Sequence, residues 1–402
     1  MPVLADSVAD LARSAGVRAC LEWFRKERGW INEQHLKLCR IPAATFLEEK
    51  RAEYMAERFR SLGWESKLDR AGNVIAWLPG KREAASVAVT AHLDTVLAPR
   101  APEDIKVAGD GRLLGPGVSD NGAGLAALLA LAGAWNAHPP LEDPALVPVL
   151  VANVGEEGEG NLCGMRYLCR AAASNRYRAF LILDGPSTDH ITCQALASRR
   201  FDLTFAGPGG HSWSDHGSVN PIHALSRTIT RFIDEAPNGL PRSSFNFGLI
   251  EGGTSINAIP SEARAKVDLR SESPRRMDEL ATLLESAMER TLEEENARAS
   301  GGRLSARLKE IGSRPGGALR PGAPILEYLA AVDAHLGIRS SLDCASTDAN
   351  IPLSLGLQAV SIGAGGQGGG AHTANEWFLP EGREAGLRRI LLALCLLLNG
   401  EG

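Results

Sequence analysis

The sequence is short of the features that mark several protein classes. Its seven cysteines contain no CxxC pair and follow no regular spacing, which argues against a disulfide framework and indicates reduced, mostly buried thiols. It has no basic run and its net charge is −5, so nothing suggests nucleic-acid binding. The most apolar run, 390–398, is too short to span a membrane. We therefore expect a cytoplasmic protein that binds neither nucleic acid nor membranes.

What is present is the ordinary composition of a globular protein. Of the 402 residues, 44% are hydrophobic and 23% are charged. This length is large for a single core, so two domains are expected. The N-terminal stretch MPVLADSVADLARSAG carries acidic residues early and lacks an apolar core, which argues against a secretory signal.

Apolar patterns predict an α/β domain in the first half of the chain. The first 60 residues read as helical, with an amphipathic helix that ends near Gly63. Strands and helices then alternate, and we expect strands at 86–94, 147–154 and 179–185 and helices at 124–138 and 165–172. This order predicts a mixed, mostly parallel sheet sandwiched by helices.

The pattern changes after about residue 195. The chain then follows a β-α-β-β-α-β order, with strands expected at 199–207, 244–253, 262–272 and 303–312 and helices at 221–236 and 277–299. This order is typical of a ferredoxin-like α+β fold. From about residue 315 the α/β pattern returns. We therefore expect one domain made of 1–195 and 315–402, with a second domain, 196–314, inserted into it. The strand at 199–207 is expected to be a dimer edge or a covered edge.

Charged residues follow the predicted parallel strands, at the edge where open parallel sheets bind ligands. They occur in the segments AHLD, GPGVSDNGAG, VGEEGEG and LILDG, and in AHTANEW after a glycine-rich loop. In chain order these residues are His92, Asp94, Asp120, Glu156, Glu157, Asp184 and His372. Taken alone, the acidic run at 156–159 would be a solvated turn. Taken together, the residues are expected to converge.

A metal centre is the chemistry that this set suits best. Several carboxylates in a partly buried site repel one another, and a pair of divalent cations would neutralise them. Nitrogen and oxygen ligands without a thiolate suit Zn²⁺, and also Co²⁺ or Mn²⁺. A carboxylate two residues from a histidine can orient the imidazole. Two adjacent glutamates can divide metal binding and proton transfer between them.

The ordered motifs HxD, GxxDN, GEEGxG, LDG and HTxNE resemble those of the M20 family of di-zinc metallopeptidases and amidohydrolases. The resemblance covers nearly the whole chain, including the inserted domain. The family includes carboxypeptidases, aminoacylases and deacetylases. The resemblance therefore implies an exopeptidase or deacylase, with a zinc-exopeptidase-like catalytic domain and an inserted lid. It implies a small peptide or N-acyl amino acid as substrate and a homodimer formed through the lid.

The resemblance also implies a set of metal ligands. Two divalent ions per chain, Zn²⁺ in the first place, would share Asp120 as a bridging ligand. His92 and Asp184 would complete one site. Glu157 and His372 would complete the other.

Three further assignments in the catalytic domain follow from the resemblance. Glu156 would be the general base, which takes a proton from the water between the metals and passes it to the leaving nitrogen. Asp94 would hold and polarise His92. The peptide bond between Asp120 and Asn121 would be cis.

The inserted domain carries its own motifs. GPGGHSWSDHG contains His211, which the resemblance implies as the residue that stabilises the developing oxyanion, often across the dimer. EGGTSINAIPSEA contains Asn257 and VDLRSE contains Arg270, at positions that commonly hold the substrate carboxylate. An arginine fork suits a carboxylate, which favours this role for Arg270 over the alternative of a strand-surface charge. The roles of Glu159 and Asp348 stay open.

Three functions remain under consideration. The first is hydrolysis of an amide bond beside a free carboxylate. The second is an N-carbamoyl or ureido amidohydrolase, or an enzyme that removes an amine from an aromatic ring, because the same metals could serve these reactions. The third is a non-catalytic metal-binding protein or structural dimer. The third is disfavoured because the chain retains all five implied ligands and Glu156.

Overall fold

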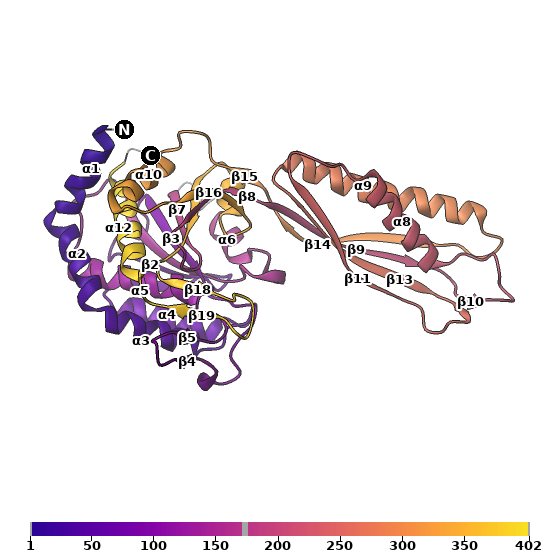
Figure 1. Cartoon of the computed structure of the whole chain (residues 1–402), viewed down its shortest axis with the longest axis horizontal. Helices are drawn as coiled ribbons and strands as arrows, with labels where there is room; N and C mark the ends of the chain where they lie inside the picture. The colour runs from indigo at the N-terminus through magenta and orange to yellow at the C-terminus, as the bar shows by residue number, and fades with distance from the viewer. Residues whose placement is uncertain (1, 171–175, 401–402) are drawn as a thin grey trace. The chain divides into compact units, whose positions relative to one another are not determined.

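The computed structural model describes residues 2–170 and 176–400, and the chain divides into two compact units (Figure 1). The larger unit comprises Met1–Ala195 and Ala318–Gly402, and the inserted unit comprises Leu196–Gly317. Each unit has hydrophobic clusters of its own, as independent domains do.

The larger unit is built around a mixed β-sheet, as the sequence predicts. Its strands, within the described residues, are β1 (Glu65–Leu68), β2 (Val74–Trp77), β3 (Ser86–His92), β6 (Val147–Asn153), β7 (Tyr177–Leu183), β8 (His190–Ala195), β15 (Gly317–Ala318), β16 (Ser341–Ala345) and β17 (Gln358–Ile362). The order is β1-β2-β6-β3-β7-β17-β8-β15, with β16 beside β8. The central pairs β6–β3, β3–β7 and β7–β17 are parallel, whereas β1–β2 and β2–β6 are antiparallel.

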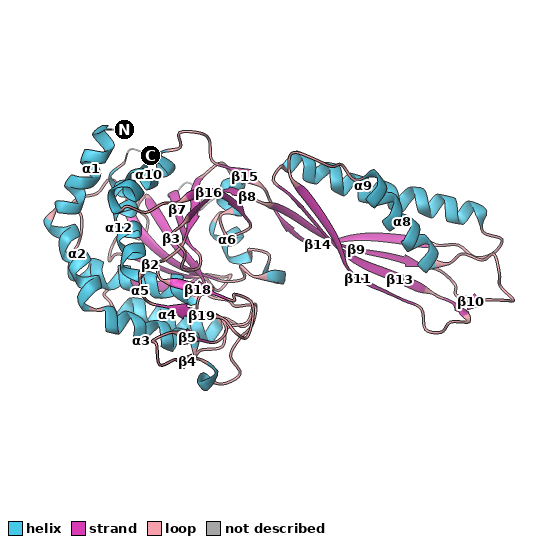
Figure 2. Cartoon of the chain, in the orientation of Figure 1, coloured by secondary structure: helices cyan, strands magenta, loops and turns pink. Residues whose placement is uncertain are grey.

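Helices cover both faces of this sheet (Figure 2). Buried residues alternate along β3: Val87 and Val89 belong to one cluster and Ala88 to the other. The first cluster includes residues of α1 (Pro2–Arg13), α2 (Ala15–Lys26), α3 (Arg28–Cys39), α4 (Glu49–Ser61), α5 (Gly122–Ala137), α10 (Pro324–Leu336) and α12 (Arg383–Asn399). The second includes residues of α6 (Cys163–Leu168) and α11 (Asn350–Ser354). Because both faces are covered, β3 and β6 are buried along their whole length, which explains their continuous apolar runs.

Two sequence expectations about helices meet the structure differently. The apolar run 390–398 lies in α12 and is buried. The helix expected at 165–172 corresponds to α6, which starts two residues earlier and ends at Leu168; positions 171 and 172 lie outside the described residues. Among the residues that the structure describes, no helix is long and apolar enough to cross a membrane.

A small sheet connects two loops of the larger unit that are far apart in sequence. Its order is β18-β19-β5-β4, formed by β4 (Lys106–Val107), β5 (Leu113–Leu114), β18 (Gln367–Gly369) and β19 (Trp377–Leu379). Trp377 lies opposite Leu114 in the antiparallel β19–β5 pair. The residues that follow β5 therefore run beside those that precede β19. Short 3₁₀ turns also lie in the larger unit: Pro102–Asp104 precedes β4, and Gly158–Gly160 follows β6.

The inserted unit has the ferredoxin-like order that the sequence predicts. Its main elements are β9 (Ala197–Ala206), α8 (Pro221–Glu235), β11 (Ser243–Gly252), β13 (Glu262–Ser271), α9 (Pro274–Arg298) and β14 (Ser305–Arg314). The strands form an antiparallel sheet of order β11-β13-β9-β14, and a short pair joins β10 (Gly210–His211) to β12 (Ala258–Ile259). The expectation that 199–207 forms an edge is wrong. Strand β9 lies between β13 and β14, and its Phe201, Leu203 and Phe205 are buried.

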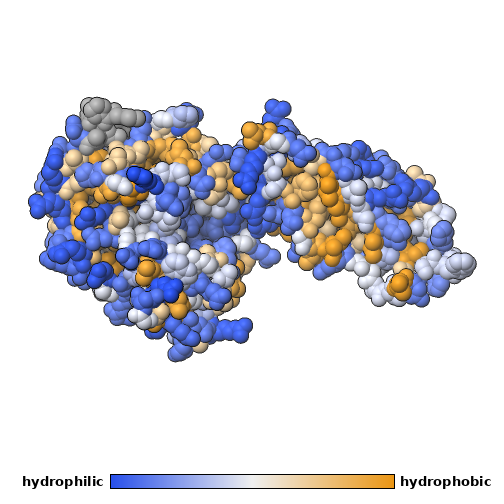
Figure 3. Space-filling view, in the orientation of Figure 1, coloured by the Kyte–Doolittle hydropathy of each residue, from blue (hydrophilic) through white to orange (hydrophobic). Residues whose placement is uncertain are grey.

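The actual edge strands of this sheet carry exposed apolar side chains. Leu249 and Ile250 are exposed on β11, and Ile311 is exposed on β14. Figure 3 shows apolar residues gathered over the strands of the inserted unit. An edge strand with exposed apolar residues is a typical surface for association with another chain.

Candidate metal centre

The carboxyl ends of the central parallel strands place polar side chains at one edge of the sheet. His92 is the last residue of β3, and Asp184 follows β7 directly. Glu156 and Glu157 follow β6, because Asn153 ends that strand. Since parallel strands end at the same side of a sheet, their following residues meet there.

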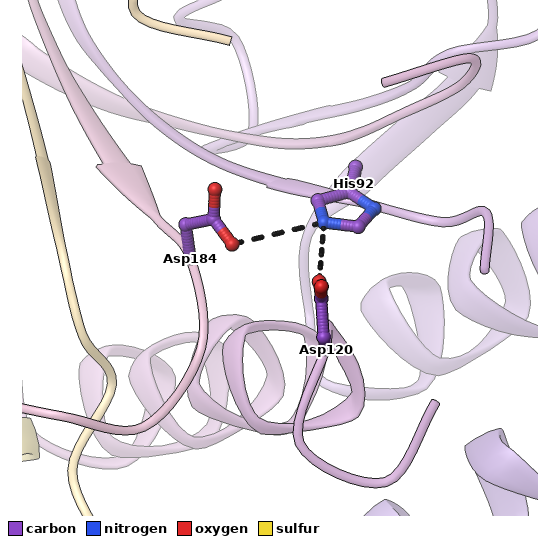
Figure 4. Close-up of side chains that lie close together, drawn as sticks. All are labelled: His92, Asp120 and Asp184. Carbon is purple, nitrogen blue, oxygen red and sulfur yellow. Dashed lines mark hydrogen bonds and ion pairs between the residues drawn. The ribbon is translucent and has the colours of Figure 1, made fainter. Parts of the chain in front are cut away.

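His92 lies between two aspartates (Figure 4). Its Nε2 is 3.0 Å from Oδ1 of Asp120 and 3.8 Å from Oδ1 of Asp184. Ligand atoms of these three residues all lie within 4.8 Å of one another, so a single ion could contact all three. The nitrogen and oxygen donors suit Zn²⁺ and related divalent ions.

A second group of donors shares Asp120 with the first. His372 Nε2 lies 3.0 Å from Oδ2 of Asp120 and 2.9 Å from Oε1 of Glu157. These three residues also have ligand atoms within 4.8 Å of one another. Because the two oxygens of Asp120 face different histidines, this carboxylate is placed to bridge two ions.

Asp94 is a buried residue that contacts several residues of the centre. It is fully buried, and His92 Nδ1 lies 2.9 Å from its backbone oxygen. Its carboxylate accepts hydrogen bonds from the backbone N–H groups of Glu156 (3.0 Å) and Glu157 (2.9 Å) and from the Thr45 hydroxyl (2.9 Å). One buried carboxylate therefore fixes the end of β3 and the loop that follows β6, and leaves Nε2 of His92 to face the metal group.

Glu156 and Glu157 are both buried, yet they have different surroundings. Glu157 belongs to the group around His372, whereas Glu156 belongs to a group with His92 and Glu157. Burial raises the pKa of Glu157. Glu156 is 5% exposed and lies close to His92 and Glu157, so it is a buried residue rather than a solvated turn residue.

Local sequence explains how Asp120 reaches this position. The peptide bond between Asp120 and Asn121 is cis. The Asn121 side chain caps α5 by accepting a hydrogen bond from Gly124 N at 3.1 Å, and it donates to the oxygen of Leu183 at 2.8 Å. Gly117 has a φ of 76°, and a Cβ there would lie 2.4 Å from Thr95 Cγ2. The second glycine of the GPGVSDN motif, Gly117, is therefore required by its positive φ and by the lack of room for a Cβ.

The titrating groups of the centre strongly affect one another's pKa values. Burial raises the pKa of Asp120, but His372 and His92 outweigh it and hold that pKa well below its usual range. Burial lowers the pKa of His92, and hydrogen bonds that its ring donates to the carboxylates of Asp120, Asp184 and Asp94 reverse this and raise the pKa well above its ordinary value. The hydrogen bond that His372 donates to the Asp120 carboxylate, with Glu157 nearby, raises the pKa of His372 to about 9.

Metal binding is expected to release protons near neutral pH. With a pKa of about 9, His372 is protonated at pH 7.5, and a metal ligand must be neutral. The metal and the proton therefore compete, and the apparent affinity should rise as pH rises toward 9. Calorimetric titrations in buffers of different ionisation enthalpy at pH 7.5 measure the protons released. A His372→Gln variant should release fewer, and equal release by both proteins would contradict the assignment.

In the inserted unit, the structure places His211 and Asn257 side by side. Ser212 N donates to the backbone oxygen of Asn257 at 3.1 Å, and the Asn257 side chain accepts from the Ser255 hydroxyl at 2.6 Å. Nδ1 of His211 accepts hydrogen bonds from the backbone N–H groups of Trp213 (3.2 Å) and Ser214 (3.3 Å). The proton of the neutral ring then sits on Nε2, so an exposed His211 presents a hydrogen-bond donor.

Arg270 lies far from His211 within the same unit. His211 is at the end of the sheet where β13 begins, because it pairs with Ala258 four residues before Glu262. Arg270 pairs with Ser198 near the other end of β13. At about 3.4 Å per residue, the strand from 262 to 270 spans roughly 27 Å. Arg270 instead bonds Asp268, with Nε 2.7 Å from Oδ2.

Sequence reasoning gave no role to two buried acidic residues beside the centre. Asp348 is buried and accepts a hydrogen bond of 2.6 Å from Asn153, which pairs with His92 in the β3–β6 ladder. Burial raises the pKa of Asp348 to about 7. Glu376 bonds the loop that carries Asp120. The HTxNE motif contains Glu376, so the motif was the available signal for this residue. Its role could not be inferred because its hydrogen-bond partners are more than 250 positions away in sequence.

Comparison with known proteins covers both units. The pattern of a peptidase dimerisation domain of the M20 type matches residues 197–296, and the pattern of peptidase family M28 matches residues 73–201. An uncharacterised protein of Bacillus subtilis, YqjE, is 25% identical over 365 residues, which is 86% of this chain and 92% of YqjE. The succinyl-diaminopimelate desuccinylase of Ruegeria pomeroyi is 27% identical over 51% of this chain and 58% of its own length.

The fold has solved counterparts. The crystal structure of aminopeptidase PepT from Bacillus cereus matches with a TM-score of 0.73 and 21% sequence identity, over 91% of this chain and 97% of PepT. The match spans both the large mixed sheet and the inserted domain. Two sets of nitrogen and oxygen donors that share an aspartate therefore lie in a peptidase fold with a peptidase dimerisation domain. These findings together support an M20-type metallopeptidase or amidohydrolase.

Proposed function

We propose that this enzyme hydrolyses an amide bond beside a free carboxylate, in small peptides or N-acyl amino acids. The observation that carries the proposal is the convergence of two histidines and three carboxylates, one of them Asp120, with Glu156 buried next to them. We assign one ion to His92, Asp120 and Asp184 and a second to Asp120, Glu157 and His372. When bound, two divalent ions would supply Lewis acidity toward the amide carbonyl and the attacking water.

In this proposal the chain's own residues handle protons and orientation. Glu156 accepts a proton from the attacking water and passes it to the leaving nitrogen. Asp94 orients His92 through its backbone oxygen and holds Glu156 and Glu157 through their N–H groups. The buried position of Glu156 beside His92 and Glu157 supports its role.

We assign His211 as the donor that stabilises the oxyanion and Asn257 and Arg270 as contacts for the substrate carboxylate. The Nε2 proton inferred for His211 supports the first role. The roughly 27 Å length of β13 separates His211 from Arg270 in one chain, so a small substrate cannot touch both residues of the same copy. A homodimer formed through the inserted unit would supply them from two copies, and the exposed apolar residues on β11 support such an interface.

Replacing His211 with alanine is expected to lower turnover by about 10²–10³-fold while metal content stays at the wild-type level, because an oxyanion donor acts only in the transition state. Steady-state kinetics and metal analysis of the same preparation measure the two effects. His223→Ala is the matched control, since His223 is also an exposed histidine of the inserted unit and its ring nitrogen contacts only Asn220 at 3.5 Å among the contacts described. Unchanged turnover in His211→Ala would make His211 a structural residue.

A substrate screen tests the proposed function. Protein loaded with Zn²⁺ or Co²⁺ would be given dipeptides, tripeptides and N-acetyl, N-succinyl and N-carbamoyl amino acids, each paired with its C-terminal amide. Cleavage of acids but not of the matched amides is expected, because the proposal requires a free carboxylate. Equal cleavage of both would refute that requirement. Cleavage of N-carbamoyl compounds alone would move the enzyme to the ureido class.

A further inference from the structure

The HTxNE motif ends in a glutamate that the proposed chemistry does not use. Glu376 is 2% exposed, and it lies between His372 and β19. Its carboxylate accepts four hydrogen bonds from one short segment, 117–120, which ends at the aspartate shared by both donor groups. The donors are Gly117 N (2.7 Å), Ser119 N (2.7 Å), Asp120 N (2.8 Å) and Ser119 Oγ (3.0 Å).

The backbone of Glu376 reinforces this connection. Gly115 N donates to the backbone oxygen of Glu376 at 2.9 Å, directly before the β19–β5 pair continues the contact. At the other end of its loop, His372 contacts Asp120 itself at 3.0 Å. The loops that carry Asp120 and His372 are therefore connected by three sets of contacts. These are the backbone bond from Gly115, the bonds to the Glu376 carboxylate and the contact between His372 and Asp120.

We propose that Glu376 is a positioning residue for the metal centre: it fixes the backbone of 117–120 so that both oxygens of Asp120 face their ions. The proposal rests on the assignment of Asp120 as the bridging ligand. A buried carboxylate that accepts hydrogen bonds from the N–H groups of three residues in one turn restricts that turn to one conformation. The aspartate that follows can then bridge two ions without reorganising its loop when they bind.

The chain contains a matched control for this arrangement. The Asp69 carboxylate also accepts four hydrogen bonds from a short turn, namely from Ala71 N (2.8 Å), Gly72 N (3.1 Å), Asn73 N (3.0 Å) and Asn73 Nδ2 (2.8 Å). That turn connects β1 and β2 and carries none of the donor residues assigned above. Replacing Asp69 with asparagine thus disturbs a comparable set of hydrogen bonds in a turn that carries no assigned ligand. This turn contacts the loop after β6 through Asn73, whose side chain accepts a hydrogen bond from Val154 N at 3.1 Å.

The test measures metal binding rather than activity alone. Zn²⁺ dissociation constants would be determined by competition with a chromogenic chelator for the full-length wild type, Glu376→Gln and Asp69→Asn, and the visible absorption of the Co²⁺-loaded proteins would be recorded. Glu376→Gln is expected to weaken metal binding by about 10–100-fold and to change the Co²⁺ spectrum. Asp69→Asn should match the wild type in both. At saturating metal, Glu376→Gln should lower kcat and leave KM unchanged.

Each outcome separates this inference from the proposed function. Wild-type protein that binds no metal would refute the proposed function. Wild-type protein that binds metal, with the same affinity and Co²⁺ spectrum in Glu376→Gln, would refute the positioning role alone. If Glu376→Gln does not fold, Ser119→Ala decides, because it removes one of the four hydrogen bonds and keeps the carboxylate. It should weaken metal binding in the same direction by a smaller factor, and unchanged affinity would overturn the inference.

Discussion

Glu156→Gln is expected to bind metal as the wild type does and to lose turnover by a factor of about 10²–10⁴. Glutamine keeps the size of the side chain and removes its ability to accept and return a proton. The backbone N–H of residue 156 would still bond Asp94, so the loop and the Glu157 ligand should stay in place. Metal analysis and steady-state kinetics on the best substrate of the screen measure both properties.

Glu159 offers a matched control for this variant. It lies three positions further along the same acidic run and is exposed, whereas Glu156 is buried. Glu159→Gln should keep turnover within about twofold of the wild type, as surface substitutions usually do. If Glu156→Gln retains more than about a tenth of wild-type turnover, another group must move the proton and the assignment of Glu156 falls.

Asp120→Ala is expected to abolish binding of both ions and, with it, activity. This residue contributes to both donor groups and contacts both histidines, so its loss leaves each ion with two of its three protein ligands. Treatment of the wild type with a chelator should have the same effect on turnover, and added Zn²⁺ should restore it. Elemental analysis of dialysed protein gives the metal content.

Thermal unfolding provides an independent readout of the same change. A ligand that binds only the folded chain stabilises it, by about 2.7 kcal/mol when its free concentration is 100 times Kd. Added Zn²⁺ should therefore raise the Tm of the wild type and of Asp110→Ala, in which an exposed aspartate of the β4–β5 turn is removed. It should not raise the Tm of Asp120→Ala. A rise in Asp120→Ala would place the bound metal elsewhere.

Local patterns were sufficient to predict the larger part of the fold. Strands β3, β6 and β7 are mostly apolar because helices cover both faces of the sheet, and such segments can be recognised directly in the sequence. Strands β1 and β2 are only four residues long and β15 only two, so they have too little periodicity to be recognised. The central position of β9 agrees with the ferredoxin-like fold that the sequence predicts, so the expectation of an edge strand was inconsistent with the fold expectation.

The residues of the candidate centre also differ in how far their positions could be predicted from the sequence. Residues that follow parallel strands, such as His92 and Asp184, must end at one edge of the sheet, so their convergence follows from topology. Glu376 belongs to no such strand end and acts through hydrogen bonds to a distant loop. The separation of His211 from Arg270 depends on the length and direction of β13, which sequence motifs do not reveal.

The inserted unit leaves and re-enters the larger unit at adjacent points. The chain leaves after β8 and returns at β15, which is the neighbour of β8 in the sheet, and Leu319 N donates to Cys193 O at 3.0 Å across this junction. A gene that lost or exchanged the segment between these points would need only a short connection to close the remaining sheet. The centre around Asp120 is encoded entirely outside that segment, so exchanging the insert would leave the residues proposed to hold metal unchanged in sequence.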